Sequence, residues 1–183
     1  MVYVLLAEGF EEVEALTPVD LLRRAGVDAK LVGVTGEMVP GTHGIGIQTD
    51  LAMDQADWDQ AEMIVLPGGM PGTNNLYADK RVTDAVRKCY DEGKYVAAIC
   101  AAPSVILGGM GLLKGRKATC YPGMEDGMAG AIPLERTCVV DGCIITACGV
   151  GGALDFGCAL VSALCGEEKA RRIAAEVVHN VRK

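Results

Sequence analysis

Short apolar runs, each followed by a helical pattern, recur through the first half of the chain. The runs cover residues 2–7, 62–66 and 95–99, and the helical patterns that follow them cover about 11–25, 74–92 and 102–109. The runs are continuously apolar rather than alternating, which is typical of strands buried on both faces of a parallel sheet. A further run at 29–34 adds a strand. The pattern predicts an α/β fold, a flavodoxin-like doubly wound sandwich with a mostly parallel sheet and helices on both faces.

The rest of the chain adds shorter elements to this plan. Residues 37–50 are rich in glycine around short β-prone segments and predict a small hairpin, a β excursion from the sheet. Later segments predict strands near 116–121, 137–140 and 143–148, and helices at about 152–165 and 167–182. The 183 residues contain no repeat or linker. We therefore expect one domain, residues 1–183, around a single core.

Charge and hydropathy limit the partners that such a chain can have. The net charge is −7 and the basic residues are scattered, which argues against a nucleic-acid footprint or an anionic membrane partner. The uncharged stretch between Lys94 and Lys114 is interrupted by Pro103 and several glycines, so we expect it in the core rather than in a membrane. Met1 leads directly into an apolar run without a basic segment, which predicts no signal peptide and a cytoplasmic location. A small-molecule partner fits these features.

The chain has eight cysteines, but their spacing does not predict a metal site. None of them forms a CxxC pair, and only two histidines are present. Zinc sites usually need such pairs or a cysteine and histidine cluster. In a cytoplasmic compartment the thiols should be reduced. We therefore expect neither a disulfide framework nor a bound metal.

Cys100 is the strongest candidate for a functional residue. It ends the apolar run at 95–99, and the positions two before and two after it are the small residues Ala98 and Ala102. This is the pattern of a nucleophile elbow, a sharp strand-to-helix turn that exposes its central side chain. The positive end of the following helix would favour the thiolate. The alternative is an inert cysteine that packs as a small hydrophobic residue in a binding domain.

Chain order predicts which groups surround this cysteine. In a flavodoxin-like sheet the first, third and fourth strands are neighbours, and ligands bind beyond their carboxyl ends. Those ends carry the acidic start of the first helix, the glycine pair Gly68 and Gly69, and Cys100. The N–H groups of Gly69 and Ala101 are the natural donors to an oxyanion, although a glycine pair also commonly forms only a tight turn.

Glu14 is the expected partner of Cys100. An ionised carboxylate would repel a thiolate, whereas a buried and protonated carboxyl could donate a hydrogen bond to it. Glu11 and Glu12 are expected to be an exposed acidic first turn. His43 lies in a glycine loop that could reach the pocket rim, and His179 is expected at the surface.

Four segments, taken together, resemble the DJ/ThiJ/PfpI superfamily, which includes the parkinsonism-associated protein deglycase and bacterial relatives. They are VLLAEGFEEVEALTPVDLLRRAG, VLPGGMPGTNNL, AAICAAP and GVGGALDFGCALVSALCG, in that order and nearly from end to end. The resemblance implies a flavodoxin-like sandwich that is usually a homodimer. It also implies an elbow cysteine at Cys100, a partner glutamate at Glu14, and oxyanion amides at Gly69 and Ala101.

Two positions depart from the pattern of that superfamily. Its intracellular-protease branch carries histidine directly after the nucleophile, where this chain has Ala101, and this weakens a peptidase assignment. Members of the deglycase branch often carry histidine in the segment that matches ATCYPG, where Tyr121 stands here. Tyr121 could still offer a hydroxyl to a substrate.

The residues leave three functions open. The first is a cofactor-independent enzyme that converts small reactive carbonyls, α-oxoaldehydes or their adducts, to hydroxy acids in a glyoxalase- or deglycase-type reaction. The second is a redox sensor or stress chaperone in which Cys100 is oxidised to a sulfinic acid beside Glu14. The third is a binding domain in which Cys100 is inert. A low-pKa, accessible thiol would suit both of the first two.

Overall fold

The computed structural model describes residues 1–179, which are built around a seven-stranded sheet. The strand order is β10 (Cys138–Asp141), β11 (Ile144–Ala147), β7 (Tyr95–Ile99), β6 (Met63–Leu66), β1 (Val2–Leu6), β2 (Ala29–Gly33) and β5 (Leu51–Ala52). Neighbouring strands are parallel except for the antiparallel pair β10 and β11. The mostly parallel, flavodoxin-like sheet expected from the sequence is confirmed.

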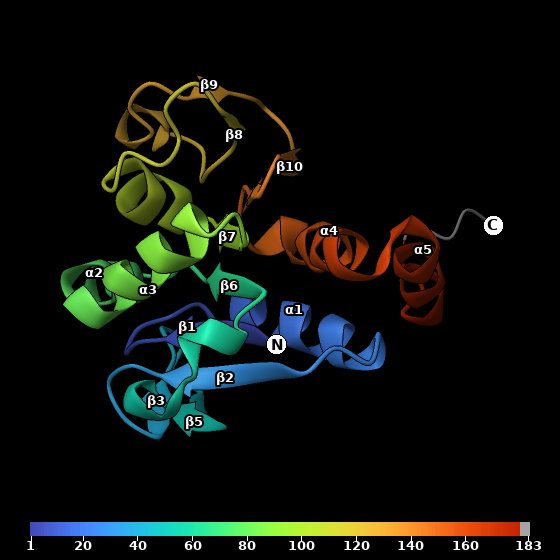
Figure 1. Ribbon diagram of the computed structural model, residues 1–183, viewed down its shortest axis with the longest axis horizontal. Helices are drawn as coiled ribbons and strands as arrows, with labels where there is room; N and C mark the ends of the chain where they lie inside the picture. The colour runs from blue at the N-terminus through green and yellow to red at the C-terminus, as the bar shows by residue number, and fades with distance from the viewer. Residues whose placement is uncertain (180–183) are drawn as a thin grey trace.

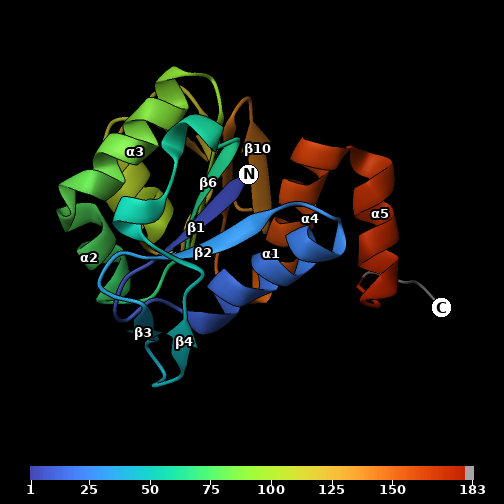
Figure 2. The ribbon, with the colours of Figure 1, turned by 60° about the horizontal axis from the view of Figure 1, so that its bottom comes forward.

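Helices cover both faces of this sheet (Figures 1 and 2). On one face lie α1 (Glu12–Arg24), α4 (Ala153–Cys165) and α5 (Glu167–Glu176), and on the other lie α2 (Gly72–Ala78) and α3 (Lys80–Asp91). Tyr3 and Leu5 of β1 pack in one core cluster, and Val4 and Leu6 pack in the other. Because successive side chains of a strand point to opposite faces, a strand covered on both faces must be apolar throughout.

Two small sheets stand outside the main one. The antiparallel pair β3 (Met38–Pro40) and β4 (Gly46–Gln48) is the hairpin predicted at 37–50. The pair β8 (Lys117–Ala118) and β9 (Ile132–Pro133) is parallel and lies beyond β10 (Figure 1). The sequence predicted a strand over 116–121, but the strand is only two residues long and does not join the main sheet.

Other boundaries differ from the predicted ones for local reasons. The single helix expected at 74–92 is two helices, because Asp79 has an extended backbone and its side chain accepts the N–H of Arg81 to cap α3. The segment expected as a helix at 102–109 is a π-helical turn, Pro103–Gly108. Short elements such as β5 and the 3₁₀ turns Met53–Gln55 and Trp58–Gln60 are too brief to produce a periodic pattern.

The last helix is shorter than expected, whereas the uncharged central stretch lies in the core as expected. The helix expected at 167–182 ends at Glu176, and residues 180–182 of that expectation lie outside the described part of the chain. The stretch between Lys94 and Lys114 supplies β7 and the π-helical turn to the core, as expected. Among residues 1–179 we find no helix with the length and apolarity needed to cross a membrane.

Candidate functional site

Cys100 stands at a strained turn directly after β7. Its φ is +65°, a left-handed conformation that non-glycine residues seldom adopt and that costs of order 1–3 kcal/mol. The turn is held on both sides, because the Cys100 N–H donates to the oxygen of Ala147 at 2.9 Å and its oxygen accepts the N–H of Tyr121 at 2.8 Å. Ala98 and Ala102 are fully buried, and the thiol side chain is half-buried. This is the elbow that the sequence predicted.

Glu14 and Cys100 meet above Gly68. The strand order β7, β6, β1 places the three expected strand ends side by side. The Gly68 N–H donates to Glu14 Oε2 at 2.9 Å. A Cβ built on Gly68 would lie 2.5 Å from Glu14 Oε2 and 3.1 Å from Cys100 Sγ, so both groups occupy the space that a side chain would need. Glycine at position 68 is therefore a condition for the contact between carboxyl and thiol.

Burial dominates the protonation of this pair. Glu14 is fully buried, and its Oε1 has no hydrogen-bond partner among the described residues. Burial raises the pKa of Glu14 to about 7, the nearby Cys100 lowers it, and the charge of Glu11 raises it further. Because a neutral carboxyl loses little when it is buried, the site favours the protonated form of Glu14.

Burial and the neighbouring charge also change the pKa of the Cys100 thiol. Burial, followed by the charge of Glu14, raises the pKa of Cys100 to about 12, while the N–H groups of Ala101 and Gly69 act in the opposite direction. Burial therefore has a larger effect on this pKa than the amides at the start of the following turn, which favour the thiolate. Groups this close titrate as a pair, so the first proton leaves the pair near neutral pH and the second is shared between sulfur and carboxylate.

The two predicted oxyanion donors both lie at the sulfur. The N–H groups of Gly69 and Ala101 interact with Cys100. Gly69 has a φ of +87°, and a Cβ there would lie 2.4 Å from the nitrogen of Glu11, so no other residue fits this close crossing of two chain segments. Gly69 forms a tight turn and also presents an amide to the sulfur, which means that the two interpretations of the glycine pair are compatible.

The expectation that Glu11 and Glu12 form an exposed acidic turn is wrong. Glu11 is only 8% exposed, and its carboxylate caps α1 by accepting the N–H of Glu14 at 2.7 Å. Glu12 is 4% exposed and accepts both the backbone N–H of His43 and, through its second oxygen, the ring Nδ1, each at 2.8 Å. The loop between β3 and β4 folds over the start of α1 and covers both carboxylates.

Glu11, Glu12 and His43 form the one cluster of possible metal ligands that we find among residues 1–179. One donor atom each from Glu11, Glu12 and His43 lies within 4.8 Å of the others. The Glu12 oxygens are already engaged by His43, and the Glu11 carboxylate by the helix start. The arrangement therefore acts as a tie between the hairpin loop and α1.

The remaining predicted pocket residues, His43 and Tyr121, differ in their distance from the sulfur. His43 is exposed on the hairpin loop, where the Glu12 carboxylate raises its pKa, and its ring contact is with Glu12. Tyr121 is closer, because its N–H binds the Cys100 oxygen and its ring borders Gly149. The structure thus brings Tyr121 to the nucleophile and leaves His43 on the rim.

Sequence reasoning missed a second wall of the site. A Cβ built on Gly149 would lie 3.8 Å from Glu14 Oε1 and 4.0 Å from Cys100 Sγ, and the Val150 N–H lowers the pKa of Glu14. Gly149 follows β11, which pairs with β7, so its place at the carboxyl edge was a usable signal. The segment that begins with GVGG contributed to the family resemblance, but none of its residues was assigned to the site.

A strained elbow cysteine beside a buried carboxyl, on a mostly parallel sheet covered by helices, defines an α/β sandwich with a cysteine at the strand-to-helix turn. The comparisons with known proteins agree with this class. Residues 1–163 match the model of the DJ-1/PfpI family, and the chain belongs to that family.

Relatives of the chain share most of its length with it. Protein DJ-1 homolog B of Arabidopsis thaliana is 37% identical over 179 residues, which is 97% of this chain but only 41% of the plant protein. Deglycase PfpI of Pyrococcus furiosus is 35% identical over 140 residues, which is 75% of this chain and 83% of the archaeal one. The solved structure of oxidized Toxoplasma gondii DJ-1 is 32% identical, covers 98% of both chains and superposes with a TM-score of 0.94.

Proposed function

We propose that the protein is a cofactor-independent enzyme that converts small reactive carbonyls, α-oxoaldehydes such as methylglyoxal or their early adducts, to hydroxy acids. The observation that carries this proposal is the contact between the Cys100 thiol and the buried Glu14 carboxyl, with the Gly69 and Ala101 amides at the sulfur. The deglycase name of the Pyrococcus furiosus relative supports the same reaction class. The site offers a nucleophile, a proton carrier and two oxyanion donors, which are the parts that addition to a carbonyl requires.

The reaction follows from the positions of these groups. The Cys100 sulfur adds to the aldehyde carbon, and the Gly69 and Ala101 amides stabilise the oxygen that becomes negative. Glu14 first gives its proton to this oxygen and, now ionised, removes the proton from the former aldehyde carbon. It then returns that proton to the neighbouring carbonyl carbon while the hydroxyl proton passes to the neighbouring oxygen, which turns the hemithioacetal into a thioester of the hydroxy acid. Water then cleaves the thioester, releases the hydroxy acid and restores the thiol. Methylglyoxal and one water thus give lactate, with no external oxidant or reductant.

A pKa near 7 suits Glu14 for this work. A carboxyl that gains and loses its proton near neutral pH can act in both proton steps, whereas an ordinary exposed glutamate stays ionised. Tyr121 lies next to the site and is expected to offer its hydroxyl to the substrate.

Lactate formation from methylglyoxal tests the proposal. Cys100→Ser should reduce the rate by at least about a thousandfold, since a serine hydroxyl in this site lacks the acidity and nucleophilicity of a thiol. Cys165→Ser, which removes an exposed thiol on α4, is the matched control and should keep full activity. Circular dichroism establishes that both variants are folded. Unchanged turnover in folded Cys100→Ser would remove this function.

A redox sensor is the second candidate, because the Cys100 sulfur is half-buried and already surrounded by a carboxyl and two amides that could hold a sulfinic acid. The relative from Toxoplasma gondii was solved in an oxidized form. Peroxide titration followed by intact mass distinguishes the two functions, since a sensor should stop at two added oxygens on Cys100 alone. Oxidation spread over several Cys and Met residues would count against the sensor.

A homodimer also belongs to this proposal. Exposed apolar side chains lie on α1, on the hairpin loop and after β11, namely Val13, Ile45, Val150 and Leu154. These residues are near the segments that form the site, and a second copy of the chain would cover them. Sedimentation velocity at micromolar concentration checks this, and a monomer there would contradict it. The single domain over 1–183 and the cytoplasmic location stay predictions.

A further inference from the structure

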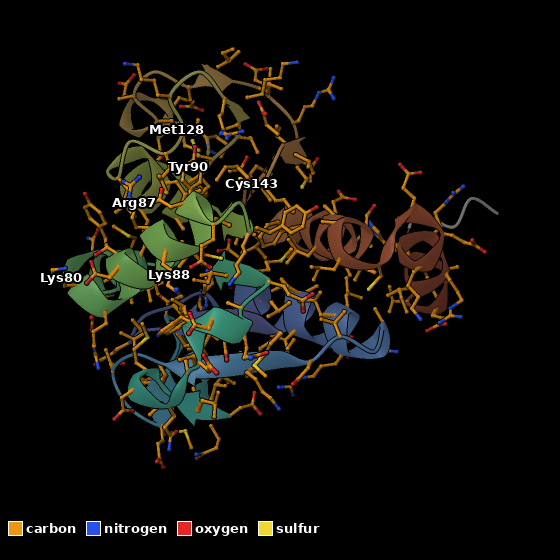
Figure 3. All side chains as sticks on the ribbon, in the orientation of Figure 1. Lys80, Arg87, Lys88, Tyr90, Met128 and Cys143 are labelled. Carbon is orange, nitrogen blue, oxygen red and sulfur yellow. The ribbon has the colours of Figure 1, made fainter. Side chains whose placement is uncertain are left out.

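A cavity of about 520 Å³ lies beside the Cys100 site and does not include the nucleophile. Its walls come from the segment around β8 and β9 and from the end of β11, and Met128, labelled in Figure 3, belongs to this part of the molecule. The residues that line its interior are Thr119, Cys120, Met128, Leu134 and Cys148. Its volume is in the range of small-molecule binding sites, roughly 300–1,000 Å³.

The cavity and the Cys100 site share a wall made of two backbone segments. Tyr121 donates its N–H to the Cys100 oxygen, and the side of Gly149 on which a Cβ would stand faces the Cys100 sulfur. Their chain neighbours Cys120 and Cys148 line the cavity. Adjacent residues of an extended chain point to opposite sides, so the catalytic crevice and the cavity are back to back. A ligand in the cavity would therefore contact the backbone segments that hold Cys100 in place.

The interior of the cavity offers a polar group. Thr119 is 5% exposed as a residue and lines the cavity. A threonine hydroxyl at a cavity wall can both donate a hydrogen bond to a polar atom of a ligand and accept one from it.

The two thiols of the cavity differ in reactivity. Cys120 is buried, its thiol donates to the oxygen of Tyr121 at 3.4 Å, and burial raises its pKa. Cys148 is half-buried and is the more accessible of the two. Since disulfide exchange requires access to the attacking sulfur, Cys148 is the thiol that should react.

The mouth of the cavity carries charges of both signs. Arg136, Glu125 and Glu135 line it, and none of them forms a salt bridge with a residue in the described range. A ligand with one carboxylate and one ammonium group would pair with both signs, whereas a purely anionic or purely cationic ligand would meet one repulsive charge. The apolar side chains of Met128 and Leu134 suit the methylene and sulfur atoms between such groups.

We propose that this cavity binds a zwitterionic disulfide of the cystine class, which forms a mixed disulfide with Cys148. The Cys148 thiolate attacks one sulfur of the ligand, the ligand's S–S bond breaks, and a new S–S bond joins Cys148 to half of the ligand. The other half leaves as a thiolate and takes up the proton that Cys148 lost, so the exchange needs no further oxidant. The bound half stays in the cavity, with its carboxylate at Arg136 and its ammonium at the two glutamates.

The test compares three disulfides of different charge on the full-length protein. The probes are L-cystine, the dication cystamine and the dianion dithiodiglycolate, with peptide mapping of the adducts on Cys148 and on the exposed Cys165 as internal reference. Relative to Cys165, Cys148 should prefer L-cystine over each of the other probes by about tenfold, the size expected from one charge-assisted hydrogen bond. Cys148→Ser should remove that adduct, and Cys120→Ser should keep it.

Charge variants at the mouth make the result specific. Arg136→Gln should abolish the preference for L-cystine over cystamine, and the double change Glu125→Gln and Glu135→Gln should abolish the preference over dithiodiglycolate. These residues are exposed, so the variants should fold normally, which thermal unfolding verifies. The same probe ratios at Cys148 and Cys165, or a Cys120–Cys148 disulfide as the main product, would overturn the proposal. Neither result depends on whether Cys100 turns over carbonyls.

Discussion

Replacing Glu14 by glutamine should stabilise the protein at alkaline pH while removing its activity. Glutamine has the same shape and keeps an oxygen to accept the Gly68 N–H, but it carries no charge. The native carboxyl is fully buried, and one of its oxygens has no partner within residues 1–179. Because the charged form is costly in this place, the fold should gain what the reaction loses.

The size of the effect follows from the pKa of Glu14, which is about 7 in the folded protein against an ordinary value of 4.5. Between these two pH values the folded state keeps a proton that the unfolded state has lost, so the free energy of unfolding falls as the pH rises. At about 1.4 kcal/mol per pH unit, the difference between 4.5 and 7 amounts to about 3 kcal/mol above pH 7. Glu14→Gln escapes this cost. It should therefore match the wild type near pH 4.5 and exceed it by about 3 kcal/mol at pH 8.

Urea unfolding of both proteins at pH 5, 6, 7 and 8 measures this difference directly. Groups remote from the site titrate alike in the two proteins, so the change of the difference with pH reports on Glu14 and its coupled partner Cys100. Glu168→Gln, at an exposed position of α5, is the matched control and should give a difference that does not vary with pH. If the gain from Glu14→Gln is equal at pH 5 and pH 8, Glu14 does not titrate between them and the proton-carrier role is wrong.

Two further predictions concern the neighbours of the pair. Glu11→Gln removes a negative charge that raises the pKa of Glu14, so the pH midpoint for alkylation of Cys100 by iodoacetamide should fall by roughly half a unit, and an unchanged or higher midpoint would contradict the role of that charge. Gly68→Ala places a Cβ 2.5 Å from Glu14 Oε2, so it should abolish lactate formation and destabilise the fold by about 1–3 kcal/mol. Gly151→Ala, where a Cβ would meet nothing within 4 Å, is its control, and equal losses in both variants would show that space at Gly68 is not the cause.

The sequence predicts best what short-range patterns determine. The bounds of β7, the hairpin at 37–50 and the neighbours of the three strand ends follow from apolar runs and from chain order. The break at Asp79 was missed because one capping side chain overrides a helical pattern that continues on both sides of it. The burial of Glu12 depends on a loop thirty residues away that folds back over α1, and no local pattern reports such a contact.

The candidate site, like the fold, could be predicted from the sequence only in part. Cys100, Glu14, Gly68, Gly69, Ala101 and Tyr121 were named from the elbow pattern, chain order and resemblance, and the structure brings them together. Gly149 and Val150 were not named as site residues, because Gly149 acts through the space that it leaves open and Val150 through a backbone N–H, and neither depends on a side chain. The protonation of the pair was also inaccessible, since it depends on how completely the fold excludes water from Glu14.

Three energetically unfavourable features meet at the carboxyl edge of the sheet, where Cys100 and Glu14 lie. Cys100 has a φ of +65°, Glu14 buries an oxygen that has no partner in the described chain, and Gly68 must stay without a side chain. None of them improves packing, since a glycine at the turn and a neutral residue in place of Glu14 would fold with less strain. A chain selected for stability alone would lose such features one by one. Their presence within a single contact supports the proposal that Cys100 and Glu14 act together in proton transfer during the reaction.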